Sequence, residues 1–233
     1  MAPHIGVLIS GADRMYCHLL GKAFSTARNR FRVVASACTT AEVIAALQEN
    51  RPQVAIISCA LQEGPQAGLR MLPLIRKTFP NSRLLVTLGS AEPELVIESF
   101  RLGADGVFSR NDPFDLLCKA VEVISEGHIW ANARQLHYVL EAFSKSPKQA
   151  TIHSKVEKQI TKREAAVVRL AVEGFSNREI ARQLTLTEHT VKNYMFRVFE
   201  KLGVSNRVEL VLSCLRQEDN DLEVLREEIG VSA

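Results

Sequence analysis

Along the first 130 residues, short apolar runs alternate with longer stretches in which apolar positions recur at helical spacing. Five of these runs are continuously apolar, as expected of strands buried on both faces. We predict strands at 5–10, 32–37, 53–58, 83–88 and 105–109, and helices near 13–27, 40–49, 67–78, 92–102 and 112–127. This alternation predicts an α/β domain built on a flavodoxin-like, doubly wound, five-stranded parallel sheet, with any site at the carboxyl ends of its strands.

The pattern changes after residue 130. One more helix is predicted at 131–143, where Leu136, Val139, Leu140 and Phe143 recur at helical spacing. Residues 144–156, SKSPKQATIHSKV, are polar and aperiodic, which predicts a linker between domains. We therefore place the first domain at 1–130 and a helix with a flexible linker at 131–157.

A second, all-α domain is predicted at 158–216. Three runs of helical period are separated only by Gly174-Phe175-Ser176 and Thr185-Leu186-Thr187. Breaks this short are typical of a helix-turn-helix. Ser176 with Glu179 predicts a capping box for a helix at 177–184. Thr187 predicts the N-cap of the next helix, which should end at Leu202 before Gly203.

That last helix has two contrasting faces. Val191, Met195, Val198 and Leu202 form one apolar stripe, while the opposite side is polar and basic, with acids only at its two ends. Asn can pair with adenine, Arg or Lys with guanine, and Phe can contact a thymine methyl. The alternative is an ordinary solvated helix face. The candidate DNA-contacting residues are His189, Thr190, Lys192, Asn193, Phe196 and Arg197, together with Asn177, Lys201 and Arg207.

Residues 207–216 form a final predicted helix, with Val208, Val211, Leu212 and Leu215 facing the core and Leu210 and Cys214 outward. An outward apolar pair predicts a partner surface. The tail at 217–233 places Leu222, Leu225 and Ile229 within an acidic frame. Both a frayed tail and a short docking helix fit that pattern.

Charge supports the same division of the chain. Of its net +3, residues 1–150 contribute +3, residues 151–216 contribute +5 and residues 217–233 contribute −5. The basic excess coincides with the predicted helix-turn-helix, as binding to double-stranded DNA requires.

Four segments of the second domain resemble the LuxR/NarL/FixJ DNA-binding domain. They are TKRE at 161–164, GFSNREIA at 174–181, TEHTVK at 187–192 and KLGVSNR at 201–207. The resemblance implies that the helix at 187–202 enters the DNA major groove and that a following helix supports dimerisation. Some members of that family have a basic residue where this chain has Phe196, so the resemblance does not carry over the base preference.

The first domain, placed before such a domain, resembles the receiver domain of a two-component response regulator. The closest local match is RLGADGVFSR at 101–110. The resemblance implies a phosphorylation site, but this chain lacks its chemistry. Gly11 and Ala12 stand where a receiver has two acids for Mg²⁺, and Ser58 stands where the phosphorylated aspartate is expected. Leu88, preceded by Thr87, replaces the usual hydroxyl residue, and Arg110 replaces a lysine.

We therefore expect a degenerate receiver that neither binds Mg²⁺ nor takes up a phosphoryl group, since both need carboxylates. Asp13 could supply one carboxylate, but we expect it to cap the helix that starts there. No catalytic residues, metal ligands or cofactor are predicted, because no phosphate loop, GxSxG or spaced His/Cys cluster occurs. We expect His128 and His137 to be ordinary core or surface residues, and Cys59 to be a buried apolar side chain rather than an oxidant sensor.

The five cysteines are scattered, the N-terminal MAPHIGVLIS is unlike a signal peptide, and no segment is apolar enough to span a membrane. These features predict a cytoplasmic protein. We expect a homodimeric, DNA-binding transcription regulator that acts without phosphorylation, in which another regulator or a small signal acts at the receiver. The alternative is a protein-interaction module that titrates a partner and binds DNA weakly.

Overall fold

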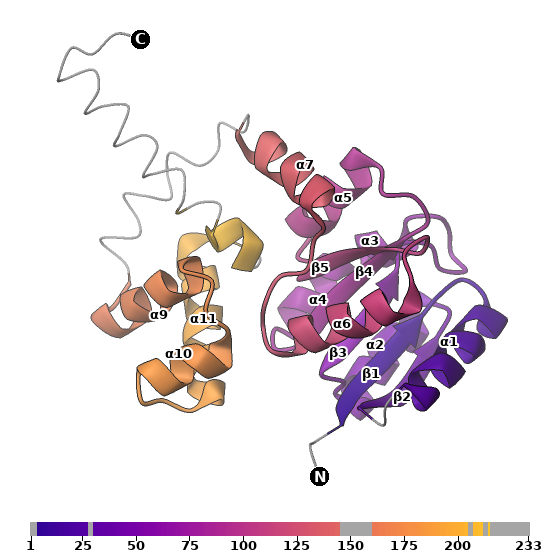
Figure 1. Ribbon diagram of the computed structural model, residues 1–233, viewed down its shortest axis with the longest axis horizontal. Helices are drawn as coiled ribbons and strands as arrows, with labels where there is room; N and C mark the ends of the chain where they lie inside the picture. Colours follow the sequence, from indigo (N-terminus) through magenta and orange to yellow (C-terminus); the bar gives the residue numbers. More distant parts are fainter. Residues whose placement is uncertain (1–3, 28–29, 145–159, 205–206, 212–213, 215–233) are drawn as a thin grey trace, which may run out of the picture. The chain divides into compact units, whose positions relative to one another are not determined.

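The computed structural model describes residues 4–27, 30–144, 160–204, 207–211 and 214. The chain divides into two compact units, Met1–Val139 and Leu140–Ala233. The first unit is an α/β sandwich, and the second is entirely helical in the part that is described (Figure 1).

The first unit is built on five parallel strands in the order β2-β1-β3-β4-β5. This order is that of the flavodoxin-like doubly wound fold, so the predicted fold class is confirmed. The observed bounds differ from the predicted ones by one residue at most. The strands are β1 Ile5–Ser10, β2 Phe31–Ala37, β3 Val54–Ser58, β4 Arg83–Leu88 and β5 Gly106–Ser109.

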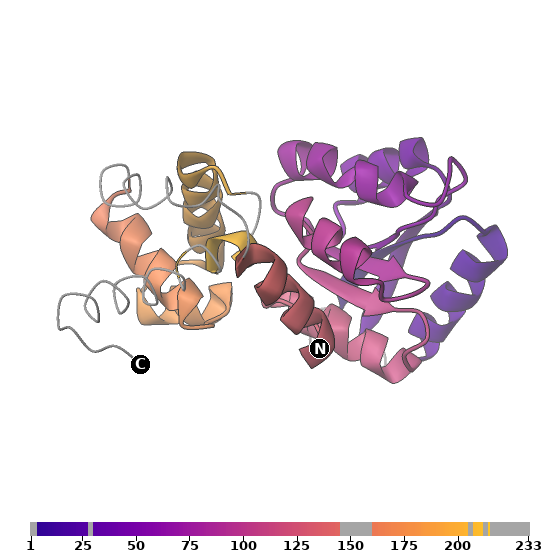
Figure 2. The same cartoon turned by 90° about the horizontal axis from the view of Figure 1, so that it is seen from above.

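Helices cover both faces of this sheet, as the view from above shows (Figure 2). On one face, α1 and α6 share a core with alternate residues of the strands, including Val7, Ile56 and Leu85. The fully buried Leu8, Ile57 and Leu84, at the intervening positions, serve the opposite face. The helices are α1 Arg14–Thr26, α2 Thr40–Asn50, α3 Ala67–Arg70, α4 Leu72–Thr78, α5 Pro93–Arg101 and α6 Phe114–Ser125.

The single helix predicted at 67–78 is wrong. The segment forms two helices, α3 and α4, that meet at Met71. Pro73 lies in the first turn of α4, where its missing N–H does no harm, whereas one continuous helix would need that donor. Gly68 fixes α3 against the end of β3, because a Cβ there would lie 1.8 Å from the Ser58 carbonyl oxygen.

The chain then covers the open edge of β5. Trp130 pairs with Gly106, and its carbonyl oxygen accepts a hydrogen bond of 3.1 Å from the Val107 N–H. Helix α7, Ala133–Ser144, follows. Of the described residues in its predicted apolar stripe, Val139 is buried, while Leu136 and Leu140 are exposed.

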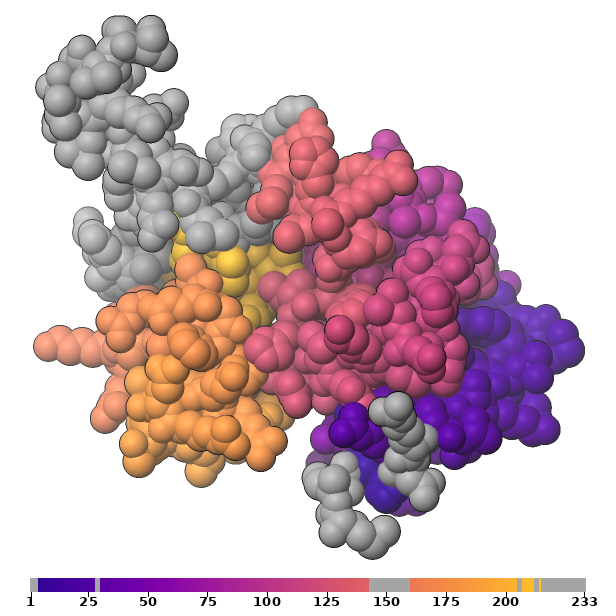
Figure 3. All heavy atoms as spheres, viewed as in Figure 1, coloured from indigo at the N-terminus to yellow at the C-terminus, as the bar shows by residue number. Residues whose placement is uncertain are grey.

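The helical unit contains α9 Lys162–Val172, α10 Asn177–Gln183 and α11 Glu188–Leu202, followed by helical residues at 207–211. Figure 3 shows the surface that the side chains of α9 and α10 form on one face of this unit. The buried core members are Val167, Val168, Leu170, Ala171, Ile180, Ala181, Val191, Met195, Val198, Leu202, Val204 and Leu210.

The outward direction predicted for Leu210 and Cys214 is wrong. Leu210 is fully buried in this core and Cys214 packs against it, whereas Val211 is only partly buried. The helix is therefore rotated relative to the predicted wheel, and the partner surface inferred from Leu210 and Cys214 is withdrawn. Ser144, the first residue of the linker predicted at 144–156, belongs to α7. The rest of that linker and the acidic tail at 217–233 lie outside the described residues.

Candidate nucleic-acid interface

Side-chain caps define where the helices of the helical unit begin. Ser176 and Glu179 form the predicted capping box of α10: the Glu179 N–H donates to the Ser176 hydroxyl at 3.3 Å, and the Ser176 N–H donates to the Glu179 carboxylate at 2.7 Å. Thr187 caps α11, as predicted. Thr161 and Glu164 form a second capping box, on α9, which was not predicted. These caps fix the direction in which α10 and α11 leave their turns.

The turn between α10 and α11 contains a conformational irregularity at Thr185. This residue has a φ of 56°, in the left-handed region that β-branched residues disfavour. The turn is closed by a hydrogen bond of 2.8 Å from the Leu186 N–H to the Ala181 carbonyl. The break of four residues between the two helices, 184–187, therefore includes one locally strained residue.

Helix α11 presents the predicted polar face. Val191, Met195, Val198 and Leu202 are buried, which confirms the apolar stripe. On the opposite side His189, Asn193 and Arg197 are exposed, and Thr190, Lys192 and Phe196 are partly exposed.

One cation on this face already has an anionic partner. The Lys192 Nζ lies 2.9 Å from the Glu188 carboxylate, one turn away on α11. A phosphate that bound Lys192 would replace a surface ion pair worth little in water. Arg197 is the exposed arginine of the same face, and it is in no ion pair with the residues that the structure describes.

Three of the predicted DNA-contacting residues are not part of the polar face that His189, Asn193 and Arg197 form. They are Asn177, Lys201 and Arg207. Asn177 is buried at the start of α10, and Lys201 donates to the Glu164 carboxylate at 2.7 and 2.8 Å. Burial acts to raise the pKa of Glu164, but hydrogen bonds from Lys201 and Thr161 outweigh it and hold the pKa below its ordinary value. The Lys201 charge is thus engaged inside the domain.

Arg207 has a structural position. Its side chain is buried, and its Nη2 donates to the carbonyl oxygens of Ala171 at 2.8 Å and Phe175 at 2.5 Å. These carbonyls belong to the end of α9 and the turn that follows, where the helix leaves acceptors unsatisfied. Arg207 therefore ties the last helical segment to α9, and we remove it from the DNA-contacting set.

Further cations that the wheel of α11 could not reveal are exposed on the neighbouring helices. Arg178 and Arg182 lie on α10, and Lys162 and Arg163 lie in the first turn of α9. In helix-turn-helix proteins the first helix of the pair crosses the DNA backbone. The position of Arg178 and Arg182 is thus the one expected for phosphate contacts.

The first unit has its candidate site at the carboxyl ends of β1, β3 and β4. Gly11 and Ala12 follow β1 and offer no side-chain oxygen. Asp13 caps α1, as predicted, since its Oδ1 accepts the N–H groups of Met15 at 2.6 Å and Tyr16 at 3.2 Å. A carboxylate that neutralises a helix N-terminus is already paired with backbone donors. The donor set expected for Mg²⁺ is therefore absent here, and the residues do not fit this metal.

Buried hydroxyls lie at the last residue of β3 and at the next-to-last residue of β4. Ser58 pairs in register with Thr87, and both side chains are buried. Leu88, at the position of a receiver's hydroxyl, is fully buried, whereas Arg110 is exposed just after β5.

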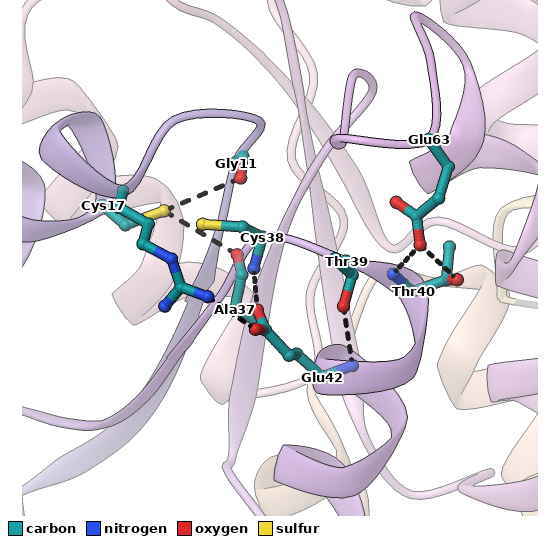
Figure 4. Close-up of polar contacts among 9 residues, drawn as sticks. Gly11, Cys17, Ala37, Cys38, Thr39, Thr40, Glu42 and Glu63 are labelled. Atoms are coloured by element: carbon teal, nitrogen blue, oxygen red, sulfur yellow. Dashed lines mark hydrogen bonds and ion pairs between the residues drawn. The ribbon is translucent and has the colours of Figure 1, made fainter.

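Cys17, Cys38 and Cys59 are buried near the carboxyl ends of the strands, and Figure 4 shows Cys17 and Cys38. The Cys17 thiol approaches the carbonyl oxygens of Ala37 at 3.8 Å and Gly11 at 4.0 Å. Burial and the neighbouring Cys38 raise the pKa of Cys17 to about 12. Burial also raises the pKa of the Cys59 thiol, against the opposing effect of Arg110. Both groups are thus held as thiols, which are weak nucleophiles.

Glu42 organises the adjoining loop. Its carboxylate accepts the Cys38 N–H at 2.6 Å and pairs with the Arg14 guanidinium at 2.9 Å, while its own N–H donates to the Thr39 cap at 3.2 Å. Hydrogen bonding to Cys38 is the main cause that lowers the pKa of Glu42. This network fixes the start of α2. It brings no set of metal-ligating side chains together, and the described part of the chain has no cluster of three or more His, Cys, Asp or Glu suited to a metal.

The helical unit matches a known family. The family model for bacterial regulatory proteins of the luxR family covers residues 158–214. These residues, which fold as a helix-turn-helix, are therefore similar to the luxR family. The match spans all three helices described above, including the polar face of α11.

Similarity to response regulators extends over most of the chain. The oxygen regulatory protein NreC of Staphylococcus aureus is 26% identical over 192 residues, which cover 82% of this chain and 88% of NreC. Among solved structures, RcsB of Salmonella typhimurium has a TM-score of 0.51 at 21% identity and covers 91% of this chain and 98% of RcsB. A LuxR-family two-component response regulator from Aurantimonas sp. SI85-9A1 has a TM-score of 0.55 at 17% identity and covers 61% of this chain and 100% of its own. These structures share the fold of this chain.

None of the helices in the described ranges combines the length and the apolar character needed to cross a bilayer.

Proposed function

We propose that this protein is a sequence-specific DNA-binding transcription regulator whose receiver-like domain acts without aspartate phosphorylation. The observation that carries the first part is the exposed face of α11, where Asn193 and Arg197 stand opposite a fully buried apolar stripe. This combination supplies a base-reading amide and a guanidinium on a helix that can enter a major groove.

The similar proteins support the same function. NreC is described as a regulatory protein, and a structure of RcsB in complex with DNA has a TM-score of 0.52 with this chain. Another structure with a TM-score of 0.51 holds two RcsB dimers on two DNAs. By analogy we propose that this chain binds a twofold-symmetric site as a homodimer in the cytoplasm, since one module of this size covers little DNA.

The second part of the proposal rests on the site at the carboxyl ends of the strands. An acyl phosphate needs an aspartate, whereas position 58 carries a buried serine whose N–H donates to the Ser10 hydroxyl. Gly11 and Ala12 leave the metal without its carboxylates. Signal input by another regulator or a small molecule is compatible with such a domain, which needs no enzymatic activity of its own.

A protein-interaction module that titrates a partner is the competing function. It requires no base preference, and the concentration of His189, Asn193 and Arg197 on one helix face is what weighs against it.

Selection from a random double-stranded DNA library separates the two functions. We expect the full chain to enrich a twofold-symmetric motif, and the Arg197→Ala protein to enrich it less strongly. Arg169→Ala, which removes an exposed arginine of α9, is the matched control and should enrich the motif normally. Recovery of DNA without any shared motif would reject sequence-specific binding and favour the titration module.

A further inference from the structure

Tyr16 lies against the position that a receiver uses for its acidic pair. Its ring packs so close to Gly11 that a Cβ on Gly11 would be 2.8 Å from the Tyr16 Cδ1 and 3.2 Å from its Cε1. Real Cβ atoms do not approach carbon this closely, so any side chain at position 11 requires the ring to move. The Asp13 cap holds Tyr16 in the first turn of α1 by accepting its N–H. Tyr16 is therefore directed over the end of β1 by local structure.

Arg110 covers the same ring from the other side of the site. Its Cζ is 5.9 Å from the centroid of the Tyr16 ring, within range of a cation–π interaction. Its Nη2 would lie 2.9 Å from a Cβ on Gly89, so the absence of a side chain at Gly89 leaves room for the guanidinium. The loops after β1, β4 and β5 thus meet through Tyr16, Gly89 and Arg110.

The phenol reaches the buried end of β4. Burial raises the pKa of Tyr16, while the Arg110 charge and the Thr87 hydroxyl act in the opposite direction. Thr87 is itself almost completely buried, and its hydroxyl does not complete a hydrogen bond of normal geometry. The aromatic ring therefore extends from Gly11 to the neighbourhood of Thr87, across the ends of β1 and β4.

We infer that Tyr16 and Arg110 fill the space in which a receiver holds its metal ion and phosphoryl group. A permanently charged guanidinium on an aromatic ring then stands where a metal ion on carboxylates would stand. The ring and the guanidinium together exclude the metal by volume, since a guanidinium is bulkier than the lysine ammonium that a receiver carries there. The inference rests on the proposed phosphorylation independence and adds a physical cause for it. Introducing carboxylates alone would not allow a metal ion to bind, because Tyr16 and Arg110 would still fill the site.

The test introduces carboxylates into the full chain in two sets of substitutions, named the closed graft and the open graft. The closed graft carries Ala12→Asp and Ser58→Asp and keeps Gly11, where any side chain would itself displace the Tyr16 ring, and the open graft adds Tyr16→Ala and Arg110→Lys. Mn²⁺ binding is followed by electron paramagnetic resonance, with circular dichroism as the check that each variant is folded. We expect the closed graft to bind Mn²⁺ no better than the wild type and the open graft to bind it at least about ten-fold more tightly. Equal Mn²⁺ affinity of the two grafts would overturn the inference.

A second measurement does not depend on the grafts. Tyr16→Ala alone should open the site and speed alkylation of Cys17, whose Sγ lies 3.3 Å from the same Cβ position on Gly11. Tyr138→Ala is the matched control, because Tyr138 stacks with Arg134 at 5.7 Å on α7. Labelling of each cysteine is followed by peptide mass spectrometry. An unchanged rate at Cys17 in Tyr16→Ala would show that the ring does not close the site.

Different experimental results would reject the proposed phosphorylation independence and the proposed role of Tyr16 and Arg110. A phosphoryl adduct on the wild-type chain would reject phosphorylation independence itself. Tight Mn²⁺ binding by the closed graft, with an unreactive wild type, would reject only the role of Tyr16 and Arg110.

Discussion

Asn193 and Arg197 are exposed one turn apart on α11, and the two side chains can contact DNA in different ways. If Arg197 binds a phosphate, its replacement by alanine should weaken binding to all sequences alike and reduce the salt slope by about one. If Asn193 reads a base, Asn193→Ala should relax the preference at one position, at a cost of about 1–3 kcal/mol. Fluorescence anisotropy across salt concentrations measures both effects. Unchanged binding of both variants would contradict the assignment of α11 as the recognition helix.

Arg207 should affect stability instead of DNA contact. Its guanidinium is buried and donates to the carbonyls of Ala171 and Phe175, so Arg207→Met removes both bonds, although Ala171 keeps the bond from the Gly174 N–H. We expect a loss of about 2–3 kcal/mol in the free energy of unfolding of the helical unit. Arg197→Met, the exposed control, should change it by less than about 0.5 kcal/mol. A reduced salt slope with unchanged denaturation would instead return Arg207 to the DNA interface.

At the level of elements, the turn between α10 and α11 contains one residue with a strained backbone conformation. Thr185 is held at a φ of 56°, and asparagine tolerates that region far better than a β-branched residue. Thr185→Asn should therefore raise the free energy of unfolding of the helical unit by roughly 0.5–1 kcal/mol. Chemical denaturation checks the change. A destabilised Thr185→Asn protein would mean that the threonine side chain contributes a contact worth more than the strain.

Element bounds follow from the sequence where local chemistry decides them. The strands begin and end within one residue of their predicted positions, and Ser176, Thr187 and Asp13 cap the helices assigned to them. Such features depend on side chains only a few residues away. The break between α3 and α4 was missed, although Pro73 marks it.

The features that could not be predicted from the sequence depend on packing between segments that are distant in the chain. A helical wheel gives the direction of a side chain relative to its own axis but not what covers it, so Arg207 looked like a surface cation and Leu210 like an exposed apolar residue. The contact of Tyr16 with Gly11 and Arg110 joins loops about a hundred residues apart in the chain, and no local pattern reports it. The lack of acidic side chains at Gly11 and Ala12 could be read directly from the sequence.

For the whole molecule, the receiver-like unit should raise DNA affinity if it contributes dimer contacts. A fragment from residue 154 onward should then fold and bind the selected site more weakly than the full chain, because the second half-site is no longer met at high effective concentration. The comparison uses anisotropy at equal salt. Tighter binding by the fragment would show that the receiver-like unit masks the recognition helix.

The central claim is tested most directly by measuring the affinity of the full chain for its selected DNA site with and without acetyl phosphate and Mg²⁺. The mass of the protein is recorded in the same samples. The absence of an aspartate at Ser58 and of acids at Gly11 and Ala12 predicts an unchanged mass and an unchanged affinity. The Ser58→Asp protein should behave alike, because residues that act as a unit are not restored singly. A base-labile phosphoryl adduct on the wild-type chain, accompanied by tighter DNA binding, would contradict the account.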